Sequence, residues 1–138
     1  DQAWLPFMAA LTSGRRALPR PLIQGGRSAG ARVACRTATE VGADAVLALS
    51  FPLHPPGKPE KSRAFEAKLV LDAGLPLGAV QGERDPFGTP DDVRAALGAQ
   101  AQVFAARGDH SFSRHPEEVL DAVRRWVGEL PERMSTNG

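Results

Sequence analysis

The chain has 138 residues, which is the length of one domain and enough to bury a hydrophobic core. Its 17 lysine and arginine residues balance 16 acidic residues to a net charge of +1, and the basic residues are scattered, which disfavours a nucleic-acid or membrane-surface partner. The single cysteine, Cys35, excludes an intrachain disulfide, and no apolar run approaches the roughly 20 residues of a membrane-spanning helix, so we expect a cytoplasmic protein.

Short apolar segments alternate with helical patterns along the chain, which predicts an α/β fold built on a parallel sheet. The expected elements, in chain order, are a strand at 21–24, an alanine-rich helix at 28–41, strands at 45–49 and 77–81, a helix that begins at Pro90, a strand at 102–105 and a helix over 116–130. The first three strands are apolar on successive residues, so we expect them to be buried on both faces of the sheet.

Prolines and capping residues predict where several elements begin and end. Thr89 and Pro90, followed by two acids, are typical of a helix start. Four prolines in 50–61 exclude regular structure and predict a stiff loop after a strand end. The last helix carries an apolar stripe, and we expect Pro131 to end it and the tail to Gly138 to be frayed. The stripe consists of Val119, Leu120, Val123, Trp126, Val127 and Leu130.

A G-x-S-x-G motif lies at 26–30, between the first expected strand and the alanine-rich helix. A strand that turns abruptly into a helix leaves little room for side chains, which explains the glycines and lifts the Ser28 hydroxyl above the sheet. The Ala29 amide at the helix N-terminus can then stabilise an oxyanion. The alternative is an ordinary strand-to-helix turn in which Ser28 caps the helix.

An acid and a histidine follow at later strand ends, as a nucleophilic serine requires. Asp85 comes directly after the strand at 77–81, and His110 comes directly after the strand at 102–105. The carboxyl ends of parallel strands are where open α/β sheets build their sites. Asp85 has the alternative role of a turn residue before a proline, and His54 and His115 compete with His110 for the role of base.

Other residues are assigned supporting positions around this serine. Arg27, His54, Phe87 and Phe112 are candidates to line a pocket, although a solvated or salt-bridged arginine is the preferred interpretation of Arg27. His115 precedes a helix start and is interpreted as a solvated neighbour of the cap. Cys35 has no metal-ligand spacing to any histidine, so we interpret it as a packing residue and expect no metal site.

Three segments resemble the small bacterial α/β-hydrolases of the dienelactone-hydrolase-like group, in the branch related to testis-expressed protein and to the non-specific-lethal complex subunit. They are the elbow at 25–34, the His-Pro-Pro-Gly loop at 51–57, and the acid and base segments at 81–88 and 108–112. The resemblance implies Ser28 as nucleophile, Asp85 as orienting acid, His110 as base and the Ala29 amide as half of an oxyanion hole. It implies no cofactor.

The chain departs from that family at its start. It opens at Asp1 and has neither the family's earlier strands nor its His-Gly-Ala-Gly-like loop, so we expect one domain over 1–138 that is the C-terminal portion of an α/β-hydrolase, with about four parallel strands and helices on both faces. The first strand would then have an open edge that recruits a second copy or a partner chain. We expect a serine hydrolase of small esters or related acyl substrates. The alternatives are a hydrolase-fold interaction module and an incomplete, catalytically weak fragment.

Overall fold

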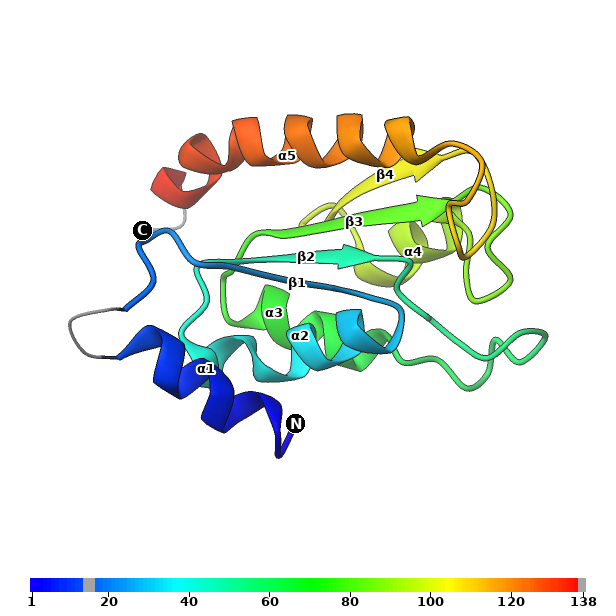
Figure 1. Cartoon of the computed structure of the whole chain (residues 1–138). Coiled ribbons are helices and arrows are strands. Elements are labelled where there is room, and N and C mark those ends of the chain that lie inside the picture. The colour runs from blue at the N-terminus through cyan, green and yellow to red at the C-terminus, as the bar shows by residue number, and fades with distance from the viewer. Residues whose placement is uncertain (14–16, 137–138) are drawn as a thin grey trace.

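The computed structural model describes residues 1–13 and 17–136 (Figure 1). Five helices and four strands follow one another in these residues. They are α1 (Trp4–Thr12), β1 (Ile23–Arg27), α2 (Ala29–Val41), β2 (Ala45–Leu49), α3 (Ala64–Asp72), β3 (Leu77–Gly82), α4 (Pro90–Leu97), β4 (Gln102–Ala106) and α5 (Pro116–Thr136).

The four strands form one parallel sheet in the order β1-β2-β3-β4, as the sequence predicts. All four strands therefore end at the same side of the sheet, where the loops that follow them gather (Figure 1). β3 is buried along its whole length. β1 begins and ends later than the expected strand at 21–24, and it is not buried on both faces, because it lies at the edge of the described sheet and leaves Gly25 and Arg27 exposed.

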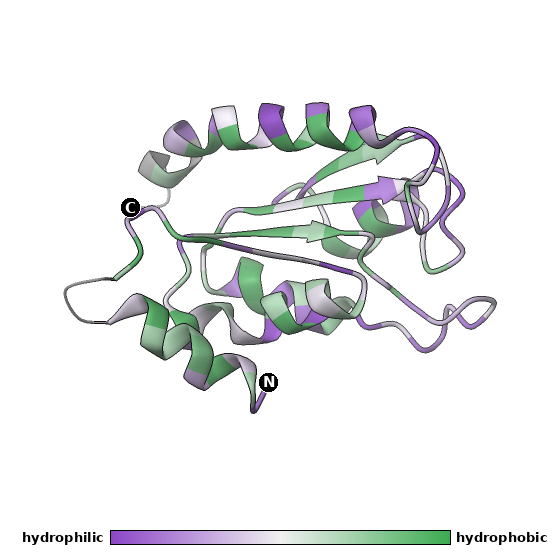
Figure 2. Ribbon diagram, viewed as in Figure 1, coloured by the Kyte–Doolittle hydropathy of each residue, from purple (hydrophilic) through white to green (hydrophobic). Residues whose placement is uncertain are grey.

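Helices cover both faces of the sheet, which confirms the expected layering. α2, α3 and α4 bury the larger cluster on one face, in which Val46, Leu77 and Val93 are almost inaccessible. α5 packs on the other face and places Trp126 and Leu130 against Ala45. Figure 2 shows the hydrophobic residues of α5 turned towards the sheet and its hydrophilic residues turned away. This two-sided burial makes the sheet a rigid base for the loops at its carboxyl side.

The last helix differs from its predicted form in two ways. It runs through Pro131 to Thr136 instead of ending there. Packing of Leu130 and Met134 on the sheet outweighs the cost of about 3 kcal/mol that an interior proline carries. Of the predicted stripe, Leu120 and Val127 are exposed, because these two residues lie two turns apart on a flank of α5 that points away from the sheet. The predicted frayed tail includes residues 137–138, which lie outside the described residues.

The remaining elements include two helices that the sequence patterns did not predict, α1 and α3. The loop over 50–61 has no helix or strand, as expected, and α4 begins at Pro90 behind a capping box between Thr89 and Asp92. Within the described residues, no helix has both the length and the hydropathy that crossing a membrane requires.

Candidate active site

Ser28 lies at the sharp turn between β1 and α2. Its φ of 53° is in the left-handed region, which non-glycine residues seldom adopt. A Cβ on Gly26 would come within 2.4 Å of the Gly30 backbone, so a side chain there would block the turn. A Cβ on Gly30 would meet nothing within 4 Å, which corrects the expectation that both glycines of the motif are needed for space.

The Ser28 side chain does not cap α2, although Ser28 occupies the N-cap position. Its Oγ instead lies 2.8 Å from Nε2 of His110, 82 residues further along the chain. The other ring nitrogen of His110, Nδ1, lies 2.8 Å from Oδ2 of Asp85. A carboxylate accepts hydrogen bonds, so Nδ1 carries the ring proton and Nε2 is free to accept a hydrogen bond from the Ser28 hydroxyl. The structure thus joins the three predicted residues in one hydrogen-bonded chain.

Asp85 serves the turn and the histidine at the same time. Its Oδ1 accepts the backbone N–H of Phe87 at 2.8 Å, which is the turn role considered from the sequence, while its Oδ2 faces His110. The Asp85 side chain is completely buried and that of His110 is 21% exposed. The Phe87 ring lies against the His110 ring, with centroids 4.4 Å apart. The His110 imidazole is therefore bonded at its edge by Asp85 and covered on one face by Phe87, two residues of the same short loop.

Gly82 gives the histidine loop its path across the end of β3. A Cβ at this position would come within 2.3 Å of the Asp109 carbonyl oxygen, so the backbone of the loop occupies the space that a side chain would need. The loop is anchored further along by Phe112, which has a φ of 57° and is buried against Val80 on the α5 side of the sheet. The close approach and the anchor together fix the backbone on both sides of His110.

Two residues with a role in this arrangement were not singled out from the sequence. The Ser50 hydroxyl donates to the backbone carbonyl of His110 at 2.8 Å. The Gln81 side chain, fully buried, accepts the Phe51 N–H and donates to the Gly88 carbonyl, which joins two of the surrounding loops. The pattern that predicted Asp85 and His110, a polar residue at the carboxyl end of a parallel strand, could have found Ser50 and Gln81 as well.

The residues predicted to line a pocket lie in different surroundings. Arg27 is exposed, and its guanidinium donates to the Ser111 carbonyl beside the histidine at 3.2 Å. His54 lies in the loop at 50–61, where its backbone N–H donates to the Phe87 carbonyl. The Phe112 side chain is 6% exposed within the α5-side cluster. His115 bonds to Glu117 at the start of α5. A pocket-lining role stays a prediction for Arg27, His54, Phe87 and Phe112.

A buried carboxylate on α3 ties down the helix that follows Ser28. Glu66 accepts hydrogen bonds from Arg32 and Arg36 of α2, with shortest distances of 2.7 Å to each. Burial by itself would raise the pKa of Glu66, but the two guanidinium groups outweigh it and hold the pKa below its usual range. Beside it, burial and the Glu66 charge raise the pKa of the Cys35 thiol to about 12. Cys35 is thus an inert packing residue.

The arrangement has the parts of nucleophilic acyl chemistry. Ser28 can lose its proton to His110 at the moment it attacks, while Asp85 orients the ring and stabilises the imidazolium that forms. Ala29 is the first residue of α2, where helical N–H groups have no acceptor within the helix, so its amide suits a developing oxyanion. Nowhere in the described ranges do three or more metal-ligating side chains come together.

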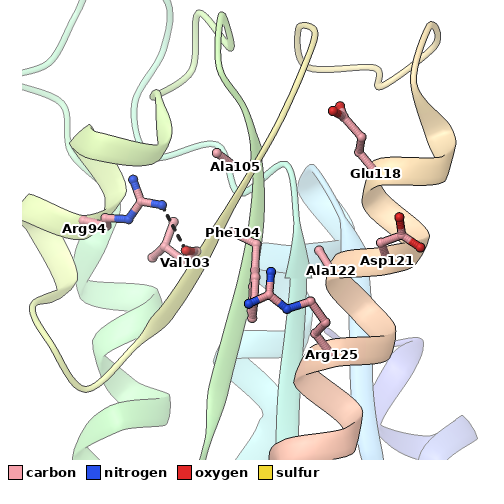
Figure 3. Close-up of a pocket in the computed structure, with 8 residues that line it drawn as sticks. All are labelled: Arg94, Val103, Phe104, Ala105, Glu118, Asp121, Ala122 and Arg125. Carbon is pink, nitrogen blue, oxygen red and sulfur yellow. Dashed lines mark hydrogen bonds between the residues drawn. The ribbon is translucent and has the colours of Figure 1, made fainter.

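A separate hollow of about 460 Å³ lies along the outer side of β4, against α5 (Figure 3). Arg94 donates from its guanidinium to the Val103 carbonyl at 3.1 Å, and the Arg125 guanidinium lies 5.8 Å from the centroid of the Phe104 ring. The first contact occupies a backbone acceptor of β4, one of the two edge strands of the described sheet, which discourages pairing with another strand. None of the residues that line this hollow belongs to the Ser28 site.

A parallel sheet that is covered by helices on both faces and has a sharp strand-to-helix turn at a serine is typical of an alpha/beta hydrolase. The chain belongs to this family, because the family profile described as an alpha/beta hydrolase domain matches residues 2–126.

Solved structures of related architecture are distant in sequence. An alpha-beta serine hydrolase homologue from Coxiella burnetii is 19% identical, over 77% of this chain and 48% of that chain, with a TM-score of 0.53. The thioesterase domain from the curacin biosynthetic pathway is 13% identical over 91% of this chain and 70% of that chain, with a TM-score of 0.58. AbyA5 is 16% identical over 96% of this chain and 51% of that chain, with a TM-score of 0.59.

These likenesses show the fold. The chain spans about half the length of the Coxiella burnetii protein and of AbyA5. Among curated proteins, none matches the chain.

Proposed function

We propose that the protein is a serine hydrolase that cleaves small esters or related acyl substrates through Ser28, His110 and Asp85. His110 Nε2 takes the proton of the Ser28 hydroxyl as Oγ attacks the acyl carbon, and the Ala29 amide receives the negative charge on the carbonyl oxygen. The bond to the leaving group breaks and His110 protonates that group. Water, deprotonated by His110, then releases the acid from the acyl-enzyme and the proton returns to Ser28.

The observation that carries this proposal is the pair of 2.8 Å contacts that His110 makes, one to the Ser28 hydroxyl and one to the Asp85 carboxylate. Both are within the range of hydrogen bonds that can move a proton. Burial of Asp85 supports the same role, because a shielded carboxylate holds the imidazole in one tautomer. Membership of the alpha/beta hydrolase family supports hydrolysis as the class of reaction.

The alternative of a hydrolase-fold interaction module is less well supported. A protein that had given up turnover would be free to let the Ser28 hydroxyl and the His110 ring move apart. They lie at hydrogen-bond distance here, and the backbone on each side of the histidine is held in place. The geometry therefore favours the hydrolase.

Labelling by a fluorophosphonate probe tests the proposal. The probe should form an adduct on the peptide that contains Ser28, and Ser28→Ala and His110→Ala should each abolish the adduct. Ser62→Ala is the matched control, because Ser62 is an exposed serine that accepts the Ala64 N–H at a helix start. Labelling that persists in both Ser28→Ala and His110→Ala would refute the proposal.

Three finer assignments are also proposed, each on an observation of its own. The dienelactone-hydrolase-like branch rests on the elbow and His-Pro-Pro-Gly segments of the sequence. A second copy or a partner chain at the open edge of β1 follows from its place at the end of the described sheet. A cytoplasmic location rests on the single, unpaired Cys35.

A further inference from the structure

Strained backbone in this protein is concentrated around one histidine. Ser28, Ser50 and Phe112 are the residues other than glycine that have a positive φ in the described part of the chain, with values of 53°, 49° and 57°. Ser28 bonds to the His110 ring, Ser50 bonds to the His110 carbonyl, and Phe112 is two residues further along the same loop. Unfavourable conformations persist where the surrounding structure holds them, and they gather at functional sites.

Ser50 and Phe112 have no part in the proposed chemistry, and of these two only Ser50 makes a side-chain hydrogen bond to the histidine. Ser50 follows β2 directly and is completely buried, and its backbone N–H donates to the Val80 carbonyl. This bond continues the pairing of β2 with β3, so the position of the Ser50 backbone is set by the sheet. Its left-handed backbone aims the hydroxyl at the His110 carbonyl, 60 residues away in the chain, at 2.8 Å.

We propose that Ser50 is a positioning residue for the histidine base. This inference rests on the proposed function. The Ser50 hydroxyl fixes the carbonyl of His110, and the Arg27 guanidinium holds the next carbonyl, that of Ser111. Two successive peptide groups are therefore tied to the ends of β2 and β1. Because the loop backbone is held at these two carbonyls, a shift of the loop cannot move the His110 ring away from Ser28 and Asp85.

The physical reason is that proton transfer depends steeply on distance. The loop that carries His110 is partly exposed, and a displacement of about 1 Å at a catalytic group costs on the order of 100-fold in rate. The ring contacts to Asp85 and Phe87 restrain the imidazole but leave the loop backbone to be held by other groups. The buried Ser50 hydroxyl supplies one such restraint from the rigid sheet.

Two substitutions separate this role from a purely structural one. Ser50→Ala and Ser50→Gly both remove the hydroxyl, but glycine accepts a positive φ and relieves the strain that alanine keeps. Ser50→Gly therefore keeps the protein folded if Ser50→Ala does not. Ser13→Ala is the matched control, because the Ser13 hydroxyl makes the same kind of bond at the same length, 2.8 Å to the Ala9 carbonyl, on the exposed end of α1.

We expect both Ser50 variants to slow fluorophosphonate labelling of Ser28 and to lower kcat for p-nitrophenyl acetate by about 10-fold to 100-fold, with KM unchanged. The Tm of Ser50→Gly should equal or exceed that of Ser50→Ala. The low-field proton resonance of His110 Nδ1–H, which reports ring placement without turnover, should broaden or disappear in both. Ser13→Ala should leave all of these readouts unchanged.

The inference would be overturned if either Ser50 variant labelled as fast as the wild-type protein and kept the His110 resonance. It would also be overturned if the wild-type protein showed no such resonance. A failure of the proposed function gives a different result. The wild-type protein would then fail to label at Ser28, while its His110 resonance would still be present and still be lost in the Ser50 variants.

Discussion

Replacement of Asp85 by asparagine tests the proposed site with little change in shape. Oδ1 of Asp85 accepts the Phe87 N–H and Oδ2 accepts the His110 Nδ1–H, both at 2.8 Å. An asparagine has one oxygen and one NH2 group, so it can satisfy only one of these donors. An asparagine oxygen turned to His110 would place the NH2 group against the partly buried Phe87 N–H, which would leave that donor unpaired at a cost of about 1–3 kcal/mol. We therefore expect the oxygen to stay with Phe87.

The asparagine NH2 then faces His110 Nδ1, which becomes an acceptor, and the ring proton moves to Nε2. A ring protonated at Nε2 cannot take the proton of Ser28. The expected fall in kcat/KM is about 10⁴-fold, the usual cost of the wrong histidine tautomer in such a triad. This corresponds to about 5 kcal/mol of transition-state stabilisation.

The measurement is kcat/KM for p-nitrophenyl acetate, together with thermal unfolding of the same preparations. Asp121→Asn is the matched control, because Asp121 is an exposed aspartate on α5 outside the site. A loss of less than 10-fold in Asp85→Asn, with unfolding unchanged, would refute the role assigned to Asp85.

Three further predictions concern the support of the site. Gly26→Ala should destabilise the protein by about 3 kcal/mol and abolish Ser28 labelling, because the added Cβ meets backbone at 2.4 Å. Gly30→Ala should be neutral or slightly stabilising, because its added Cβ meets nothing within 4 Å. Denaturant unfolding of both variants measures the two effects. Glu66→Gln should cost about 2–3 kcal/mol at pH 7, less than for a fully buried pair because Arg32 remains one-third exposed. Because the pKa of Glu66 is lowered in the folded protein, its contribution to stability is fully present above the pKa of the unfolded chain and is lost as the pH falls through the folded-state value. The difference in unfolding free energy between wild type and Glu66→Gln should therefore shrink in acid. A constant difference from pH 7 to pH 3 would contradict the assignment. Cys35 should resist iodoacetamide in the native protein and react only on unfolding, because its thiol is buried and its pKa is raised to about 12; mass spectrometry at increasing denaturant concentrations would detect native-state alkylation if the burial were wrong.

Local patterns predicted most of the strands and helices of the sheet. The strand at 45–49 agrees with β2 at both ends, and α4 begins at the expected Pro90. Two outcomes were decided by packing instead. α5 continues through Pro131 because residues on both sides of the proline gain contacts with the sheet, and β1 has an exposed face because it lies at the edge of the described sheet. Such outcomes depend on neighbours far away in the chain, which no local pattern contains.

The candidate site divides in the same way. The amino-acid sequence was enough to predict that Ser28, Asp85 and His110 meet, because each follows a parallel strand and parallel strands end at one side of a sheet. The contacts that hold these residues in place became visible in the folded protein: the space that Gly82 leaves for the histidine loop, and the Ser50 hydroxyl that donates to the His110 carbonyl. These contacts join segments about 27 to 60 residues apart, and their geometry exists only when the strands have paired in register and both faces of the sheet are covered.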